Sequence, residues 1–71
     1  MYKVGTCLLP DLLKRRGMTQ TELALRLKVT RQRINALANN REKMSLETAY
    51  TIAEILQCDM ADLYTWEVST E

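Results

Sequence analysis

Apolar side chains recur every three or four positions through most of the chain, which is the spacing of one buried face of an α-helix. Residues that start and stop helices divide this stretch into segments. We expect a first helix that begins near residues 8–10 and ends before Gly17, and further helices over residues 20–27, 31–38, 46–57 and 60–63. The expected apolar stripe of the fourth helix comprises Leu46, Ala49, Ile52, Ala53 and Leu56.

Hydroxyl residues precede three of these segments. Thr19, Thr30 and Ser45 each stand where a side-chain oxygen can accept a hydrogen bond from a free N–H of the first helical turn. Thr19 and Glu22 also have the spacing of a capping box. Gly17 suits the left-handed backbone that commonly ends a helix. These residues predict the helix boundaries given above.

The two ends of the chain alternate apolar and polar residues, which is typical of a β-strand. Because a lone strand needs a partner, we expect residues 1–6 and 64–68 to pair as a short antiparallel ribbon. Two arrangements stay open for Tyr64 and Trp66: they cover the core, or they are exposed as a dimer patch. The predicted fold is an all-α domain of five helices that spans residues 1–71, with this ribbon joining its ends.

Candidate chemistry is sparse. Cys7 and Cys58 are the only cysteines and the chain has no histidine, so a zinc site would lack ligands. We expect both thiols to be reduced and to pack as small apolar groups. No nucleophile is placed beside a base, so we expect neither an enzyme nor a cofactor, metal or small-molecule ligand. No apolar run could span a bilayer and no signal peptide is present, which favours the cytoplasm.

Charge is strongly separated along the chain. Residues 14–43 carry nine lysines and arginines against two glutamates, a net charge of +7, whereas residues 44–71 carry six acidic residues and no cation. The net charge of +1 for the whole chain hides this division. Such a distribution suits a polyanion that docks on one side only.

The third expected helix has a polar face that can read base pairs. At about 100° per residue, Ile34 and Leu37 point inward while Gln32 and Ala36 point almost opposite. Arg31 lies at the exposed tip, and the side chains that flank the outward face are Arg33 and Asn35, with Asn39 near it. Arginine, glutamine and asparagine can bond guanine or adenine edges bidentately, and alanine can contact a thymine methyl.

The order of these motifs resembles the Cro/phage-repressor (XRE) family of helix-turn-helix proteins. The resemblance covers about residues 8–64 and is carried by Thr19-Gln20-x-Glu22-Leu23-Ala24, Val29-Thr30-Arg31-Gln32, Ile34, Asn39, Ser45-Leu46-Glu47-Thr48 and Ile52-Ala53. It implies a five-helix, lambda-repressor-like domain with a helix-turn-helix at about residues 19–39. In such proteins the third helix enters the major groove, usually as a homodimer on a pseudo-palindromic operator in double-stranded DNA.

The resemblance also implies roles for individual residues. The residues that would face base edges are Thr30, Arg31, Gln32, Arg33 and Ala36. Those that would hold backbone phosphates are Thr19, Gln20, Asn39, Arg41 and Lys43. Gln20 would also brace the reading helix, and Arg33 could serve either role.

Three positions depart from the family pattern. Lys28 stands where the family usually has a glycine with left-handed backbone, a conformation that costs other residues about 1–2 kcal/mol. Asn40 replaces the usual glycine after the third helix, and asparagine tolerates this conformation better than most residues. Ala36 stands where a longer polar side chain often reads a base, so this chain is expected to discriminate fewer positions.

Two functions from different classes fit these observations. The first is a sequence-specific transcription regulator, expected to be a small repressor from a phage or another bacterial mobile element. The second is a protein-interaction module of the same fold, which would neutralise another regulator or a toxin through its acidic fourth helix and aromatic tail. The second hypothesis leaves the basic third helix unexplained.

Overall fold

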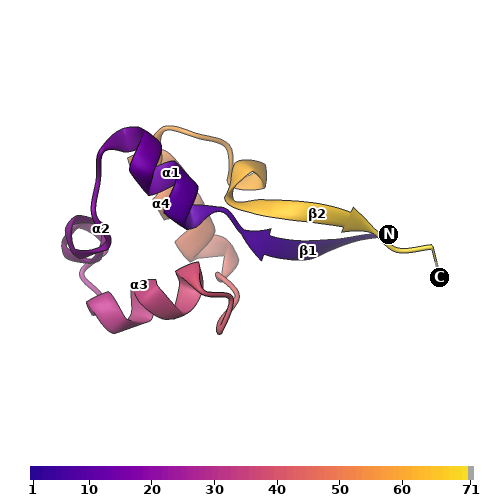
Figure 1. Cartoon of the computed structure of the whole chain (residues 1–71), viewed down its shortest axis with the longest axis horizontal. Coiled ribbons are helices and arrows are strands. Elements are labelled where there is room, and N and C mark those ends of the chain that lie inside the picture. The colour runs from indigo at the N-terminus through magenta and orange to yellow at the C-terminus, as the bar shows by residue number, and fades with distance from the viewer. Residues whose placement is uncertain (71) are drawn as a thin grey trace.

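A computed structural model describes residues 1–70 of the chain. Its elements are, in order, β1 (Tyr2–Cys7), α1 (Leu9–Arg16), α2 (Gln20–Leu27), α3 (Arg31–Ala38), α4 (Leu46–Leu56), the 3-10 helix η1 (Met60–Leu63) and β2 (Tyr64–Val68). The helices pack into one body, and the two strands form a ribbon that projects from it (Figure 1). The molecule is therefore elongated, with extents of 40 × 21 × 20 Å.

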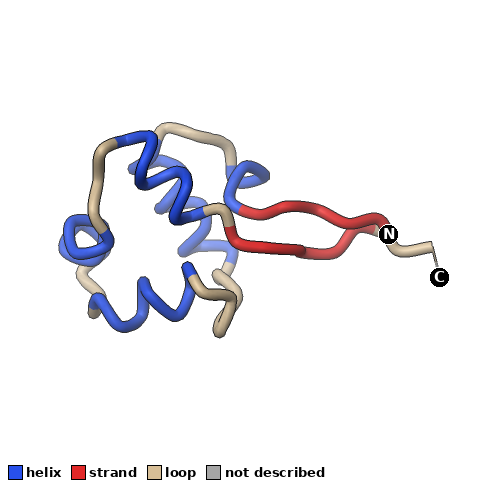
Figure 2. Tube along the Cα trace, viewed as in Figure 1, coloured by secondary structure: helices blue, strands red, loops and turns tan. Residues whose placement is uncertain are grey.

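The described residues contain four α-helices, so the predicted count of five is wrong. The fifth segment has the predicted bounds but is a single 3-10 turn, since β2 begins directly after Leu63 and leaves no room for a second turn. Within this turn the Asp62 carboxylate accepts a hydrogen bond from the Asp59 N–H at 3.2 Å. Figure 2 shows η1 at the base of the ribbon.

The predicted capping residues define the ends of the helices. The hydroxyls of Thr19, Thr30 and Ser45 each accept a hydrogen bond from the N–H three residues later, at 3.1 Å in every case. Gly17 ends α1 with a φ of 63°. The fourth helix ends one residue earlier than predicted, because Gln57 takes a left-handed φ of 55°.

The predicted ribbon is confirmed, with β1 antiparallel to β2. Val4 pairs with Trp66 and Cys7 with Tyr64, so β1 holds one more residue than β2 between these pairs and forms a bulge. Gly5 lies in this bulge, where a Cβ would overlap the Thr65 hydroxyl. That hydroxyl accepts a hydrogen bond from the Thr6 N–H at 2.8 Å.

The core lies where the four helices meet the base of the ribbon. Its fully buried large side chains are Leu9, Leu23, Ile34, Leu37, Ile52, Leu56 and Leu63. Leu46 does not belong to it, contrary to the predicted stripe. The side chain of Leu46 is 75% exposed because it occupies the first position of α4, outside the packed turns. Tyr64 covers the core, which is the first of the two arrangements left open, whereas the side chain of Trp66 is 47% exposed.

Both cysteines are free thiols, as predicted. Cys7 is buried in the core and Cys58 is half-buried. Burial raises the pKa of each thiol above its usual value, and the Asp62 carboxylate adds to the rise at Cys58. A raised pKa keeps a thiol protonated and weakly nucleophilic at neutral pH, so both behave as packing residues.

Candidate nucleic-acid interface

The turn between α2 and α3 sets the angle between these two helices. Lys28 occupies the left-handed region with a φ of 59° and a ψ of 41°, the conformation expected at the position usually held by glycine. The Val29 N–H donates to the Ala24 carbonyl at 3.0 Å and closes the turn. Thr30 then caps α3, so only three residues separate the two helices.

The inward side of α3 is anchored by its apolar residues. Ile34 and Leu37 are fully buried, and Ala38 is nearly so. Ala24 on α2 is also buried, as expected of a small residue where two helices cross closely. Packing on this side leaves Arg31, Gln32 and Arg33 exposed at the start of α3.

Arg41 lies beside Arg31 and Gln32, in the loop that follows α3. The backbone N–H of Arg41 donates to the Ala36 carbonyl at 2.9 Å, which folds the loop back onto the helix. A shallow hollow results, lined by Arg31, Gln32, Asn35 and Arg41. The structure therefore brings Arg41, which is predicted to bind a phosphate, beside Arg31 and Gln32, which are predicted to read bases. Arg31 and Arg41 lie ten positions apart in the sequence.

A chain of amide hydrogen bonds links α3 to α2. The Asn35 side chain donates to the Gln20 side-chain oxygen at 3.4 Å and accepts from the Asn39 side chain at 3.0 Å. Gln20 thus braces α3, as the resemblance implied. The bridging role of Asn35 was missed from the sequence, although Asn35 and Asn39 are four residues apart on one helix and therefore neighbours.

The remaining predicted residues divide between the helix starts and the loop. Thr19 and Thr30 use their hydroxyl oxygens as helix caps, but each hydroxyl proton stays available to a further acceptor. Ala36 is half-buried rather than fully outward, and Lys43 is exposed in the loop after α3. Asn39 is exposed at the end of α3.

Asn40 has a structural role that the sequence did not reveal. It takes the left-handed conformation with a φ of 63°, as expected for the residue that replaces glycine there. Its side-chain oxygen also accepts a hydrogen bond from the Cys7 N–H at 2.9 Å. This bond fixes the loop after α3 to the base of the ribbon, which a glycine could not do.

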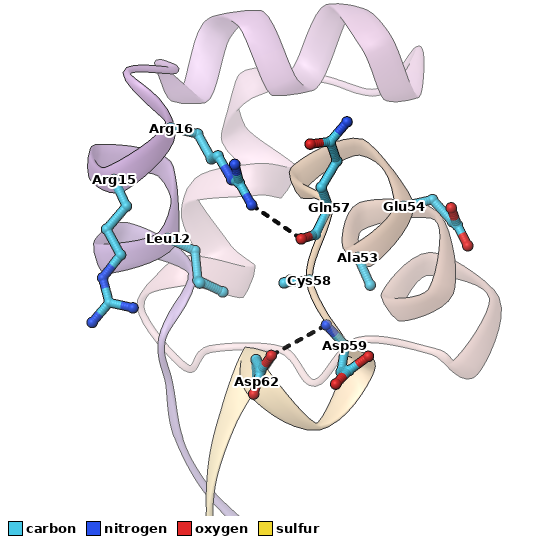
Figure 3. A pocket seen from close by; sticks show the side chains of 9 residues that line it. All are labelled: Leu12, Arg15, Arg16, Ala53, Glu54, Gln57, Cys58, Asp59 and Asp62. Atoms are coloured by element: carbon cyan, nitrogen blue, oxygen red, sulfur yellow. Dashed lines mark hydrogen bonds between the residues drawn. The ribbon is translucent and has the colours of Figure 1, made fainter.

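A separate hollow lies between α1, α4 and η1, and none of its lining residues belongs to α3 (Figure 3). The guanidinium of Arg16 crosses it to donate to the Gln57 carbonyl at 3.0 Å. This contact satisfies a carbonyl at the end of α4. Within residues 1–70, no three metal-ligating side chains are grouped to hold an ion, and no helix is long and apolar enough to cross a membrane.

Comparison with known proteins agrees with this arrangement. Residues 9–69 match the family described as the Cro/C1-type HTH DNA-binding domain. The chain is also 33% identical over 69 residues to the SPbeta prophage-derived uncharacterized HTH-type transcriptional regulator YopS of Bacillus subtilis (strain 168). That alignment covers 93% of this chain and 90% of the relative.

Proposed function

Because the chain belongs to the Cro/C1-type helix-turn-helix DNA-binding family, we propose that it regulates transcription by sequence-specific binding of double-stranded DNA through α3. The observation that carries the proposal is the hollow lined by Arg31, Gln32, Asn35 and Arg41, with Arg33 exposed on another side of the first turn of α3. An exposed polar surface of this kind, on a helix whose opposite side is buried in the core, suits the major groove, which admits one α-helix.

Base recognition is assigned to the start of α3. Arg31 and Arg33 present guanidinium groups that match the O6 and N7 acceptors of guanine, and Gln32 matches the N6 and N7 edge of adenine. Thr30 adds a hydroxyl at the tip of the helix. The half-buried Ala36 offers at most a methyl contact, so discrimination should depend on the first turn of α3.

Phosphate binding is assigned to residues around this surface. Thr19 and Gln20 stand at the start of α2, where free N–H groups and the helix dipole favour an anion. Asn39, Arg41 and Lys43 line the other end of α3 and its loop. Arg33 can serve either role, since it is exposed but lines a separate hollow between α2, α3 and α4. Contacts on both sides of α3 would fix its register in the groove.

We further propose that residues 1–71 act as one domain and bind as a homodimer on a pseudo-palindromic operator. A symmetric pair places two copies of α3 in successive major grooves about 34–36 Å apart. A small repressor of a phage or another mobile element is the role that best fits, since the relative is a prophage-derived regulator.

A binding titration tests this function. Fluorescent duplexes cut from a bacterial or phage genome are titrated with the full chain at several salt concentrations. We expect one fragment to bind far more tightly than the rest, with an affinity that falls linearly on a log–log plot against salt. Equal affinity for every fragment, or affinity independent of salt, would contradict the proposal.

A second candidate function is the protein-interaction module. It is favoured by Leu46 and Tyr50 on α4, which are 75% and 58% exposed and share a surface with Glu47. Capture of a regulator or toxin by a chain that binds no DNA at low salt would establish this function instead. Arg31, Gln32 and Arg33 would then be a solvated helix face.

A further inference from the structure

The loop between α3 and α4 carries two exposed cations, Arg41 and Lys43, which are both predicted to bind phosphates. Asn40 stands immediately before Arg41, and Met44 stands immediately after Lys43. The left-handed backbone of Asn40, with its φ of 63°, turns the chain out of α3, and residues 41–44 form an irregular segment that leads to α4. Contacts with other parts of the fold must therefore fix the position of the two cations.

Two hydrogen bonds tie the ends of this segment to the ribbon. The Cys7 N–H donates to the Asn40 side-chain oxygen at 2.9 Å. The Met44 N–H donates to the Tyr64 hydroxyl at 3.1 Å. Cys7 is the last residue of β1 and Tyr64 is the first residue of β2, and the two are register partners. One residue pair at the base of the ribbon therefore holds both ends of the segment (Figure 1).

The pair of Cys7 and Tyr64 is a firm support for the loop. Cys7 is 4% exposed and Tyr64 is 7% exposed, and both belong to the core. The Tyr64 ring packs edge-on against Trp66, with the ring centroids 6.4 Å apart. The Trp66 indole N–H in turn donates to the Ala61 carbonyl at 2.8 Å. Because protein interiors are closely packed, a buried pair of this kind can move little.

We propose that Asn40 and Tyr64 are positioning residues for DNA binding, which hold the loop so that Arg41 and Lys43 meet the DNA backbone. This inference deepens the proposed function and rests on it for the role of the two cations. Tyr64 is buried, so it acts through the loop and not by touching DNA. Ordering one free loop residue on binding costs roughly tenfold in affinity, and a loop that is held beforehand avoids this cost.

Asn40→Gly and Tyr64→Phe each remove one of these hydrogen bonds and change little else. Glycine adopts the left-handed backbone readily, so Asn40→Gly removes the acceptor of the Cys7 N–H without straining the loop. Phenylalanine keeps the ring of Tyr64 and removes only the hydroxyl. The matched controls are Gln57→Gly, at a left-handed position at the end of α4, and Tyr50→Phe, on an exposed ring.

A double-mutant cycle shows whether the two residues act through the cations. The affinity for the tightest-binding duplex is measured for each variant in the unmodified chain and in the R41A/K43A chain, at a salt concentration where both bind. We expect N40G and Y64F each to lower affinity about tenfold in the unmodified chain. In the R41A/K43A chain the loss should be less than about twofold, because the side chains that are positioned have already been removed.

Equal losses in the two chains would overturn the proposal, since N40G and Y64F would then act on the whole fold or through a direct contact of Asn40 with DNA. The control variants should leave affinity unchanged in both chains. Base discrimination is a further readout. The loop is held apart from the first turn of α3, so both variants should keep the preference for the operator over its single-base variants. Loss of this preference would also overturn the proposal. Thermal unfolding checks that the variants fold, and N40G decides alone if Y64F does not.

Amide hydrogen exchange tests the positioning without DNA. The Arg41 N–H donates to the Ala36 carbonyl at 2.9 Å, and neither variant removes this bond. We expect the Arg41 amide to exchange about fivefold faster or more in N40G and Y64F, while the buried residues of α3 keep their protection. If the chain binds no duplex, the proposed function fails, and exchange alone decides whether Asn40 and Tyr64 hold the loop. If it binds DNA but Arg41 exchanges at the same rate in every variant, the positioning fails alone.

Discussion

The side-chain amide of Asn35 on α3 donates a hydrogen bond to the side-chain oxygen of Gln20 at the start of α2, at 3.4 Å. Gln20 also stands where free N–H groups favour a phosphate. The same residue would therefore connect the position of the DNA backbone with the orientation of the reading helix. Hydrogen bonds from a protein to DNA phosphates fix the protein's register on the duplex, although they carry no sequence information.

Substituting Gln20 should affect DNA binding more than folding. In Gln20→Ala, the loss of one neutral, partly buried hydrogen bond lowers the free energy of unfolding by about 1 kcal/mol. Operator affinity should fall further than this, because a phosphate contact and the brace of α3 are lost together. Urea unfolding and a DNA titration measure the two effects. Thr21→Ala, at the exposed neighbouring position, is the control and should change neither.

Substituting Gln32 and Arg41 should separate base reading from phosphate binding. Gln32→Ala should reduce discrimination at one base pair of each half-site by about 1–3 kcal/mol, whereas Arg41→Ala should weaken binding to all sequences about equally and lower the salt slope by about one. Titration of the operator and its single-base variants at several salt concentrations measures both. Arg15→Ala, in the hollow away from α3, is the control for charge removal. Uniform weakening by Gln32→Ala would argue against its role in reading.

Replacing Lys28 with glycine should stabilise the fold. The left-handed backbone costs a non-glycine residue about 1–2 kcal/mol, while glycine costs about 0.5–1 kcal/mol in chain entropy, so Lys28→Gly should gain about 0.5–1 kcal/mol. Gln57→Gly, with the same backbone conformation at the end of α4, should gain a similar amount. Thermal unfolding measures both. If Lys28 also contacts a phosphate, Lys28→Gly will lower DNA affinity and Gln57→Gly will not. If both variants bind DNA as tightly as the unmodified chain, the role of Lys28 is structural only.

Tyr64 should make the fold sensitive to alkaline pH. Burial raises the pKa of the Tyr64 hydroxyl, whose oxygen accepts a hydrogen bond from the Met44 N–H at 3.1 Å. Because the pKa of Tyr64 is higher in the folded than in the unfolded state, the free energy of unfolding keeps its full value below the ordinary tyrosine pKa of about 10. It falls as the pH rises above that value. Urea unfolding between pH 7 and 11 should show this loss in the unmodified chain.

The matched variants for this effect are Tyr64→Phe and Tyr50→Phe. Tyr64→Phe should be less stable at neutral pH by about 1–3 kcal/mol, because the partly buried Met44 N–H loses its acceptor. Its stability should nevertheless change less between pH 9 and 11. Tyr50→Phe removes the hydroxyl of an exposed ring and should keep the alkaline loss. An equal loss in all three proteins would show that Tyr64 is not its source.

The helices and their ends could be predicted because local signals determine them. Thr19, Thr30 and Ser45 act within one turn, and a single residue type at one position suffices to cap a helix. The left-handed backbone at Lys28 and Asn40 could likewise be inferred from positions where glycine is usual. The exposure of Arg31, Gln32 and Arg33 followed from helical spacing, since the inward residues of α3 determine which residues point outward, but Ala36 is half-buried instead of outward.

Other features depend on contacts between distant segments, which spacing does not encode. Leu46 fits the apolar stripe of α4 by spacing but lies beyond the packed turns and is exposed. Tyr64 and Trp66 have equivalent places in an alternating strand, yet only Tyr64 is buried, because it is the first residue of β2 and this strand runs away from the helical body (Figure 1). The bond from the Cys7 N–H to Asn40 joins residues 33 positions apart and could not be seen before the fold was known.

Selection of duplexes from a random oligonucleotide pool tests the central claim most directly, when the unmodified chain and its Gln32→Ala variant are compared. If α3 reads DNA as proposed, the unmodified chain enriches a palindromic consensus whose half-sites are about one helical turn apart. The variant then enriches the same consensus with one position per half-site relaxed. Failure of the unmodified chain to enrich any sequence, or an identical consensus from both proteins, would contradict the account.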